Sequence, residues 1–302
     1  MGSLGRVVRA VRAFSGEWSR LSGLGPRRKT LGLALGGGFA RGIAHIGVLK
    51  VLEEEGIPVD YVAGTSVGAI IGAGYCSGMS AAELSDLART LRLSSFARLT
   101  LSRYGFYNND RMVRFFERVL TQHTFEDLKI PLAIVATEFR TGEPAVFTAG
   151  KLVDPIRASC AYPGMFLPVE IGGKSYIDGM LAYPVPTTPL RQMGADCVLG
   201  IYLSAHWNQA KPPRHLFEVI GQCFSIAQAK LADSWKKDAS LVIEPELAGF
   251  SYDCFERTPE LIAVGEMAMK AALPQVRAML GVAERKTAVP STTISPQTSP
   301  AA

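Results

Sequence analysis

Residues 30–77 read TLGLALGGGFARGIAHIGVLKVLEEEGIPVDYVAGTSVGAIIGAGYCS, and this stretch decides the fold. A short apolar run at residues 30–35 ends in three glycines, and a helical pattern over 43–55 then stops at a glycine. A second short strand is predicted at 61–63, before an apolar, glycine-rich helix at 67–77. The stretch therefore predicts two successive strand, loop and helix units, which are typical of an α/β protein with a largely parallel sheet.

The same alternation continues along the chain. Further strands are predicted at residues 132–137, 145–148, 197–203 and 241–243, and further helices at 81–91, 110–122, 155–160, 214–236 and 258–280. Residues 169–178 are predicted to form a hairpin, because Gly172-Gly173 is a two-residue turn signal, and this places Asp178 at a strand end. The expected fold class is α/β, with a central, mostly parallel sheet flanked by helices.

Composition divides the chain into three regions. Residues 1–29 form a basic amphipathic leader, 30–285 the globular domain, and 286–302 a Pro/Ser/Thr-rich tail that is expected to be disordered. Because 48% of the 302 residues are hydrophobic and only 20% are charged, the chain as a whole falls outside the disordered class. No internal repeat and no linker calls for a second domain.

Residue types that bind metals or nucleic acids form no pattern. The four histidines include no i, i+4 pair beside a carboxylate, so neither a metal site nor a cofactor is predicted. Basic residues gather in the leader rather than on a folded face with interleaved aromatics, which argues against nucleic-acid binding. The five cysteines form no C-x-x-C pair and lie in apolar segments, which is typical of buried thiols in a reducing compartment.

The leader has the pattern of a helix that lies on a membrane surface. Its apolar residues step by four, three, four and three along one stripe, at Val7, Val11, Phe14, Trp18 and Leu21. Arginines occupy the rest of the circumference, so we expect residues 1–25 to bind an anionic membrane surface. The alternative is a core helix that covers part of the domain. The arginines interrupt any signal-peptide pattern, and no run of eighteen apolar residues exists, so we expect a cytoplasmic protein that docks peripherally.

Gly64-Thr65-Ser66-Val67-Gly68 is a G-x-S-x-G pentapeptide between a predicted strand and a predicted helix. Glycines two residues on either side of a serine allow the sharp turn that exposes its hydroxyl at the C-terminal edge of a sheet. Ser66 is therefore a candidate nucleophile. The alternative interpretation is a glycine-rich turn that serves only helix packing.

The run Gly36-Gly37-Gly38-Phe39-Ala40-Arg41-Gly42 lies one strand and helix upstream. A glycine loop that enters a helix presents free backbone N–H groups to an anion, and in an esterase this anion is the tetrahedral oxyanion. A dinucleotide-binding loop is the competing interpretation, but Arg41 stands where the third glycine of the G-x-G-x-x-G pattern is required.

Asp178-Gly179, taken alone, fits an ordinary turn. Together with the two glycine motifs and the run ASCAYPGMFLP at residues 158–168, it resembles the patatin-like phospholipase family over residues 30–280. The resemblance is strongest to bacterial stand-alone members and implies a three-layer patatin-like fold that acts on phospholipids or other acyl esters.

By this resemblance Ser66 attacks the acyl ester, Asp178 accepts its proton without an intervening histidine, and water hydrolyses the acyl-enzyme. The backbone N–H groups of Gly37, Gly38 and Phe39 are implied to line the oxyanion hole. The motif positions that support them are Gly36, Arg41, Gly42, Gly64, Gly68 and Gly179. The chain departs from the family at Met180, where a small residue is usual, and at Ala182-Tyr183, where asparagines are frequent.

Three alternative functions remain open. The chain order Ser66, Asp178, His206 is also that of an α/β-hydrolase triad, with His206 after a predicted strand. A catalytically weak lipid-binding or regulatory protein of the same fold is the second alternative, and acyl transfer to a carrier is a third.

Overall fold

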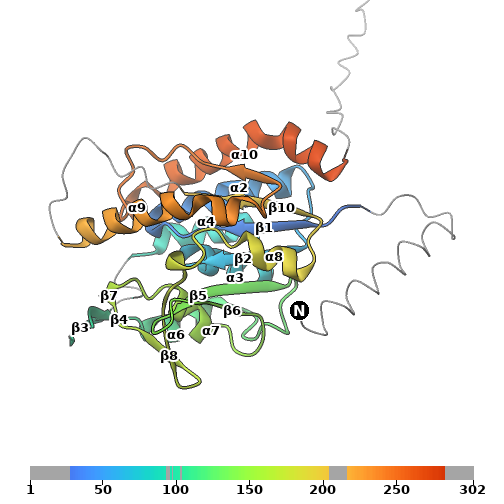
Figure 1. The fold of residues 1–302 in the computed structure, drawn as a ribbon. Helices are drawn as coiled ribbons and strands as arrows, with labels where there is room; N and C mark the ends of the chain where they lie inside the picture. The colour runs from blue at the N-terminus through green and yellow to red at the C-terminus, as the bar shows by residue number, and fades with distance from the viewer. Residues whose placement is uncertain (1–27, 93–95, 97, 103, 204–215, 283–302) are drawn as a thin grey trace, which may run out of the picture.

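A single large sheet forms the centre of the molecule (Figure 1). Within residues 28–92, 96, 98–102, 104–203 and 216–282, which the computed structural model describes, this sheet has eight strands in the order β11-β10-β1-β2-β5-β9-β8, with β6 paired to β5. Its strands are β1 (Leu31–Leu35), β2 (Tyr61–Thr65), β5 (Leu132–Glu138), β6 (Pro144–Phe147), β8 (Val169–Ile171), β9 (Lys174–Asp178), β10 (Cys197–Ile201) and β11 (Leu241–Ile243).

The sheet has a parallel part and an antiparallel part. Strands β11, β10, β1, β2 and β5 run parallel, as the strand and helix alternation predicted. Strand β9 is antiparallel to both β5 and β8, and the turn between β8 and β9 is Gly172-Gly173, so the predicted hairpin is confirmed. The mostly parallel α/β class is therefore confirmed, and the hairpin adds an antiparallel edge.

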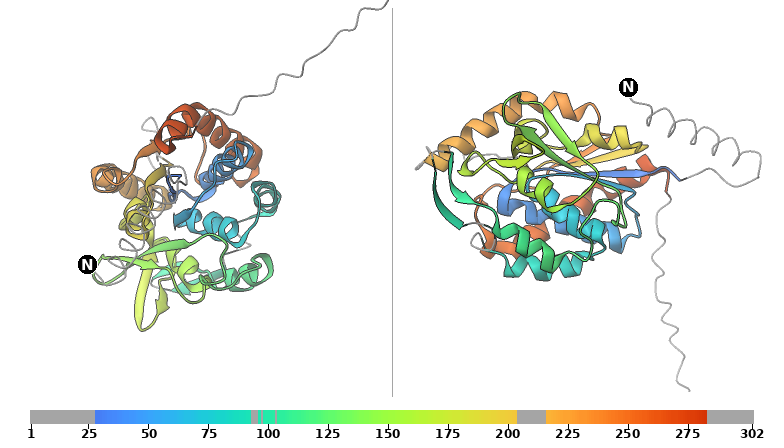
Figure 2. Two further views of the ribbon diagram at one scale, coloured as in Figure 1. Left: turned by 90° about the vertical axis from the view of Figure 1, so that its right-hand side faces the viewer. Right: turned by 90° about the horizontal axis from the view of Figure 1, so that it is seen from below.

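Helices cover both faces of the sheet and complete three layers. They are α2 (Ala44–Glu54), α3 (Val67–Ser77), α4 (Ala81–Thr90), α6 (Arg111–Val119), α7 (Val153–Ser159), α8 (Thr187–Met193), α9 (Leu216–Lys236) and α10 (Thr258–Leu280), with short 3-10 helices η1 (Phe39–Ile43), η2 (Gly179–Leu181) and η3 (Phe255–Arg257). In the left view of Figure 2, α10 (red) and α2 (blue) lie on one side of the sheet, and α8 (yellow) and α9 (orange) on the other. Successive side chains of β1 point to opposite faces of the sheet and pack against both helix layers. Leu33 belongs to the hydrophobic cluster with α2 and α10, whereas Ala34 packs with Leu190 of α8 and Trp235 of α9.

A second, three-stranded sheet in the order β3-β4-β7 was not predicted. It consists of β3 (Arg98–Ser102), β4 (Gly105–Asn108) and β7 (Gly164–Phe166). Helix α8 was not predicted either. These elements are short, and β4 and β7 show no clean period-two alternation. Strand β3 reads RLTLS and does alternate, but five residues without a recognisable partner strand were not assigned from the sequence.

The expectation of buried thiols is wrong for one cysteine. Cys76, Cys197 and Cys254 are buried and Cys160 is partly buried, but Cys223 is exposed. Apolar neighbours in the sequence misled the prediction, because Cys223 lies on the outward side of α9 while the adjacent Phe224 packs inward. The leader up to residue 27 and the tail lie outside the described residues, as does His206.

Candidate active site

Ser66 stands in a strained turn between β2 and α3. Its backbone has φ 54° and ψ −122°, a region that costs a non-glycine residue roughly 1–3 kcal/mol. The flanking glycines are required by close approach. A Cβ on Gly64 would lie 2.5 Å from the Gly68 carbonyl oxygen, and a Cβ on Gly68 would lie 2.1 Å from the Leu35 carbonyl oxygen. The predicted strand, turn and helix around the pentapeptide are therefore confirmed.

Strand register brings Asp178 to Ser66. Thr65 pairs with Val135 at the end of β2, so Ser66 follows at the level of Ala136, the next residue of β5. Ala136 pairs with Asp178 on this same side of β5, because β6 occupies the opposite side. The Ser66 hydroxyl donates a hydrogen bond to Asp178 Oδ2 at 2.8 Å. Two residues that lie 112 positions apart thus meet directly at one edge of the sheet.

The Asp178 carboxyl group is fully buried, and its two oxygens have different donors. Oδ2 accepts from Ser66, while Oδ1 accepts from the Met180 N–H at 2.9 Å. Burial raises the pKa of Asp178 from 3.8 to about 7, although the hydrogen bonds from Met180 and Ser66 act in the opposite direction. A carboxylate with a pKa near neutrality is well matched to the role of a general base.

Gly179 allows the main chain after Asp178 to reach this position. A Cβ on Gly179 would lie 2.2 Å from the Val135 carbonyl oxygen, so only glycine fits. The Thr137 hydroxyl donates to the Asp178 carbonyl oxygen at 2.9 Å and fixes the strand end from the other side.

The glycine loop between β1 and η1 lies beside Ser66. A Cβ on Gly37 would lie 2.3 Å from Met180 Cγ and 3.4 Å from Ser66 Cβ, so the missing side chain lets the loop approach the serine. Gly36 ties the loop to the sheet through its N–H, which donates to the Ile201 carbonyl at 3.1 Å. Further along, Gly42 has no room for a Cβ because Val67 Cγ1 would lie 2.2 Å away.

The N–H groups of the loop are not equivalent. The Gly37 N–H donates to the Pro184 carbonyl at 3.2 Å. Among the described residues, the N–H groups of Gly38 and Phe39 have no hydrogen-bond acceptor. Phe39 also has a positive φ of 52°, which is unusual for a bulky residue. Within the described residues, the N–H groups of Gly38 and Phe39 can therefore donate to a ligand, whereas the N–H of Gly37 already donates to the Pro184 carbonyl.

Two supporting residues were not identified from the sequence. The Ser159 hydroxyl accepts a hydrogen bond from the Ser66 N–H at 2.7 Å and donates one to the Val135 carbonyl oxygen at 2.6 Å. Ser159 therefore holds the turn that carries Ser66 against β5. His45 is fully buried, and its Nε2 lies 2.8 Å from the Gly36 carbonyl oxygen. Burial lowers the pKa of His45 to about 4, so the ring is neutral at pH 7 and Nε2 carries the proton that is donated to Gly36. Ser159 lies in the run at 158–168, but no spacing rule signals either role.

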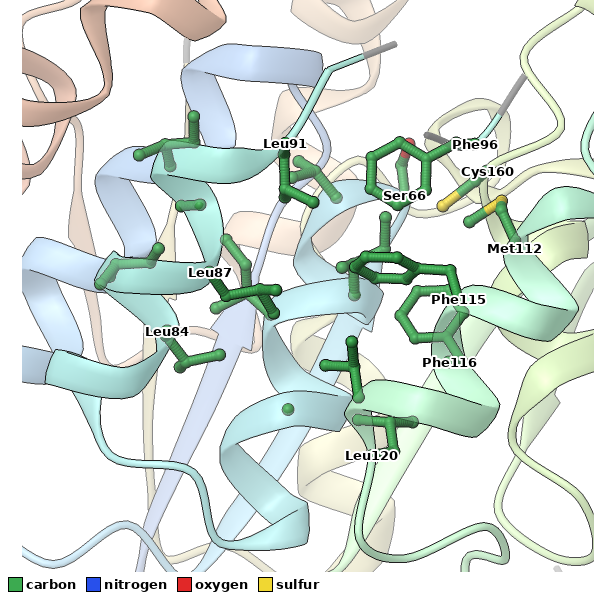
Figure 3. Close-up of a pocket in the computed structure, with 18 of the residues that line it drawn as sticks. Ser66, Leu84, Leu87, Leu91, Phe96, Met112, Phe115, Phe116, Leu120 and Cys160 are labelled. Carbon is green, nitrogen blue, oxygen red and sulfur yellow. The ribbon is translucent and has the colours of Figure 1, made fainter. Parts of the chain in front are cut away.

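An apolar cavity opens at Ser66. It runs between α3, α4 and α6 and encloses about 110 Å³. Figure 3 shows the side chains of α4 and α6 on opposite sides of this space, with Ser66 and Cys160 close together at one end. Its lining from α3 is Ser66, Val67, Ile70, Ile71 and Gly74. These positions form one face of the helix, and eight residues of rise place Gly74 roughly 12 Å from Ser66.

No group of three or more His, Cys, Asp or Glu side chains in the described part of the chain has the arrangement to hold a metal ion. None of the helices described is both long enough and apolar enough to cross a bilayer.

The site thus consists of a serine in a strained strand-to-helix turn. This serine is hydrogen-bonded directly to a buried aspartate and is flanked by a glycine loop. The patatin-like phospholipase family model matches residues 33–191, and the chain belongs to this family. The expected resemblance is thereby confirmed.

Known proteins similar to this chain include two curated relatives. An uncharacterized NTE family protein of Mycobacterium tuberculosis is 34% identical over 185 residues, which cover 60% of this chain and 51% of that protein. Lysophospholipase nte1 of Aspergillus fumigatus is 30% identical over 201 residues, which cover 64% of this chain and 13% of that protein. The chain thus spans about half the length of the mycobacterial relative. Among solved structures, VipD from Legionella pneumophila has a TM-score of 0.47 at 14% identity, covering 83% of this chain and 67% of that chain.

Proposed function

We propose that this chain is a serine lipid-acyl hydrolase of the phospholipase A or lysophospholipase type, with Ser66 as nucleophile and Asp178 as its base. The observation that carries the proposal is the 2.8 Å hydrogen bond between the two side chains at the end of an apolar cavity. Membership of the patatin-like phospholipase family and the name of the fungal relative support the same class of substrate.

The proposed reaction has two halves. Asp178 accepts the Ser66 proton as Oγ attacks the acyl carbonyl carbon, and the carbonyl oxygen becomes an oxyanion. Protonated Asp178 then returns the proton to the departing alcohol, which leaves an acyl-enzyme on Ser66. In the second half Asp178 deprotonates a water molecule that attacks the acyl carbon, and the fatty acid leaves as the Ser66 hydroxyl is restored.

The oxyanion hole is proposed to consist of the Gly38 and Phe39 N–H groups. Their freedom from other acceptors within the described residues supports this assignment. Gly37 joins them only if its N–H exchanges the Pro184 carbonyl for the oxyanion. The positive φ of Phe39 is consistent with a loop held in a conformation that serves the reaction.

The acyl chain is proposed to occupy the cavity along α3. Its walls are almost entirely apolar, with buried Met112, Phe115 and Phe116 on α6 facing Leu84 on α4. Such a lining binds a hydrocarbon chain by removing its surface from water. Apart from Ser66 and Cys160 at one end, its lining offers no polar side chain to orient a hydrophilic substrate, which favours lipid esters over small polar ones.

A Ser-Asp-His triad through His206 and a catalytically weak lipid-binding protein are the alternatives. The triad requires a histidine between serine and aspartate, whereas here the two side chains contact each other. A binding protein has no use for a strained serine beside a buried carboxylate with a raised pKa.

The test is release of fatty acid from a panel of lysophospholipids, diacyl phospholipids and monoacylglycerols, identified by mass spectrometry. Ser66→Ala and Asp178→Asn are expected to abolish release while thermal unfolding stays cooperative, and His206→Ala to keep most of it. Full activity in the Asp178→Asn enzyme, or its loss in the His206→Ala enzyme with unchanged unfolding, would overturn the proposed mechanism.

A further inference from the structure

Arg41 is a buried cation that lacks a carboxylate partner among the described residues. Its side chain is only 8% exposed, and its Nε is buried without a hydrogen bond to any described group. Burial lowers its pKa, and the groups that act against this are Cys254, Tyr162 and Tyr202, none of which is a carboxylate. Residues 204–215, SAHWNQAKPPRH, contain no Asp or Glu. Because a buried guanidinium that has no carboxylate partner among the described residues is costly, the retention of Arg41 favours an anionic ligand.

A second cavity gives Arg41 room for such a ligand. This Arg41 cavity lies between the glycine loop and α9, and is lined by Gly38, Phe39 and Arg41 on one side and by Phe224, Ser225 and Gln228 on the other. It encloses about 30 Å³. A single ordered water needs about 10–15 Å³, so the space admits a small anionic group.

Phe39 connects the two cavities. It lines both the apolar cavity at Ser66 and the Arg41 cavity, and its N–H is one of the two proposed oxyanion donors. An ester whose carbonyl lies at this point has its acyl chain directed to one side of Phe39. The remainder of the molecule is then directed toward Arg41.

We propose that Arg41, together with Gln228, binds the phosphate group of the substrate. This inference rests on the proposed function, because it places the phosphate relative to an acyl ester held at Ser66. In glycerophospholipids and lysophospholipids the phosphate is joined to the acyl ester through glycerol, so acyl chain and phosphate occupy separate cavities. The planar guanidinium matches phosphate oxygens through paired N–H donors, and the Gln228 amide, 4% exposed, supplies another donor type. The preferred substrates are therefore phosphate-containing lipids rather than neutral glycerides.

Kinetics on a matched pair of substrates test this inference. Octanoyl lysophosphatidylethanolamine and monooctanoylglycerol carry the same acyl ester and differ in the phosphate headgroup. Arg41→Met is expected to raise KM for the phosphate substrate about 10- to 100-fold more than KM for the glyceride, so that the ratio of the two kcat/KM values changes by this factor. Arg41→Lys is expected to recover part of the loss, and Gln228→Leu to show a smaller effect of the same selectivity. The exposed Arg140→Gln removes one positive charge elsewhere and serves as the control.

A binding measurement separates this site from the hydrolase proposal and distinguishes the sources of phosphate. Inorganic phosphate and glycerol 3-phosphate are each expected to raise the melting temperature of the wild type and of Arg140→Gln, to raise that of Gln228→Leu by less, and to leave that of Arg41→Met unchanged. Stabilisation by both anions without selective kinetics assigns the cavity to free phosphate rather than to the headgroup.

Three results would overturn the phosphate site. Equal losses on both substrates would make Arg41 a support of the glycine loop, and unchanged kinetics with no stabilisation would leave only water in the cavity. If neither substrate is hydrolysed, the hydrolase proposal fails by itself, and the absence of an Arg41-dependent shift with phosphate would then remove the site as well.

Discussion

Replacing Asp178 by asparagine is expected to abolish turnover and to stabilise the fold above neutral pH. The native carboxyl group keeps its proton up to about pH 7, whereas the unfolded chain releases it near the ordinary value of 3.8. The contribution of the protonated group to stability is therefore fully present below about pH 4 and is lost as the pH rises through about 7. At about 1.36 kcal/mol per pH unit, this loss amounts to about 4 kcal/mol.

Asparagine has the same shape but cannot ionise, so it escapes this loss. Its amide oxygen can still accept from Met180, and its amide nitrogen can donate to Ser66. Urea unfolding from about pH 5 to pH 9 measures the difference in unfolding free energy between the variant and the wild type. The difference is expected to grow in favour of Asp178→Asn across this range and to level off above about pH 8.

Ser66→Ala is the matched control, because it abolishes the nucleophile but keeps the buried carboxyl group. Its stability is expected to fall with pH as that of the wild type does. Over the same range wild-type kcat/KM is expected to rise and level off above about pH 7, since only the carboxylate form accepts a proton. Parallel stability curves for Asp178→Asn and the wild type, or a flat pH profile of activity from about pH 5 to pH 8, would refute the account of a buried base.

Three further predictions concern the glycine loop, the acyl cavity and the leader. Gly38→Ala places a Cβ 2.7 Å from Leu203 and displaces an oxyanion donor, so kcat is expected to fall on the order of a hundredfold; normal kcat would place the hole elsewhere. Gly74→Val narrows the far end of the apolar cavity against Leu84, so kcat/KM for long-chain esters is expected to fall about tenfold or more relative to short ones; equal effects on all chain lengths would contradict this. Removal of residues 1–25 is expected to reduce sedimentation with anionic liposomes at low salt, and equal binding by both forms would refute a role for the leader.

The nucleophile region was readily predicted from the sequence because its geometry leaves glycine no substitute. Gly64, Gly68 and Gly179 each lie where a Cβ would be within about 2.5 Å of main-chain atoms. The glycines of these motifs are therefore sterically required, which is why the motifs predict the local structure. Helix α3 was predicted with the bounds that the structure shows, because its apolar run begins at the turn and ends at Gly78 in the left-handed conformation.

Features that depend on contacts between segments distant in the sequence could not be predicted from the sequence. The strands β3, β4 and β7 are short and irregular, and only their mutual pairing makes them a sheet. Likewise, no local pattern shows that the Gly37 N–H is engaged by Pro184, or that the neutral ring of His45 holds the Gly36 carbonyl. These contacts arise when loops from different parts of the chain meet at the sheet edge.

The most direct test of the central claim is to locate the adduct formed with a fluorophosphonate probe, which reacts covalently with an activated serine. Peptide mass spectrometry of the labelled protein is expected to find the adduct on Ser66. Labelling is expected to disappear in Asp178→Asn, which keeps Ser66 but lacks the base, and to persist in His206→Ala. Absence of an adduct on Ser66 in the folded wild type, or undiminished labelling of the Asp178→Asn protein, would contradict the account.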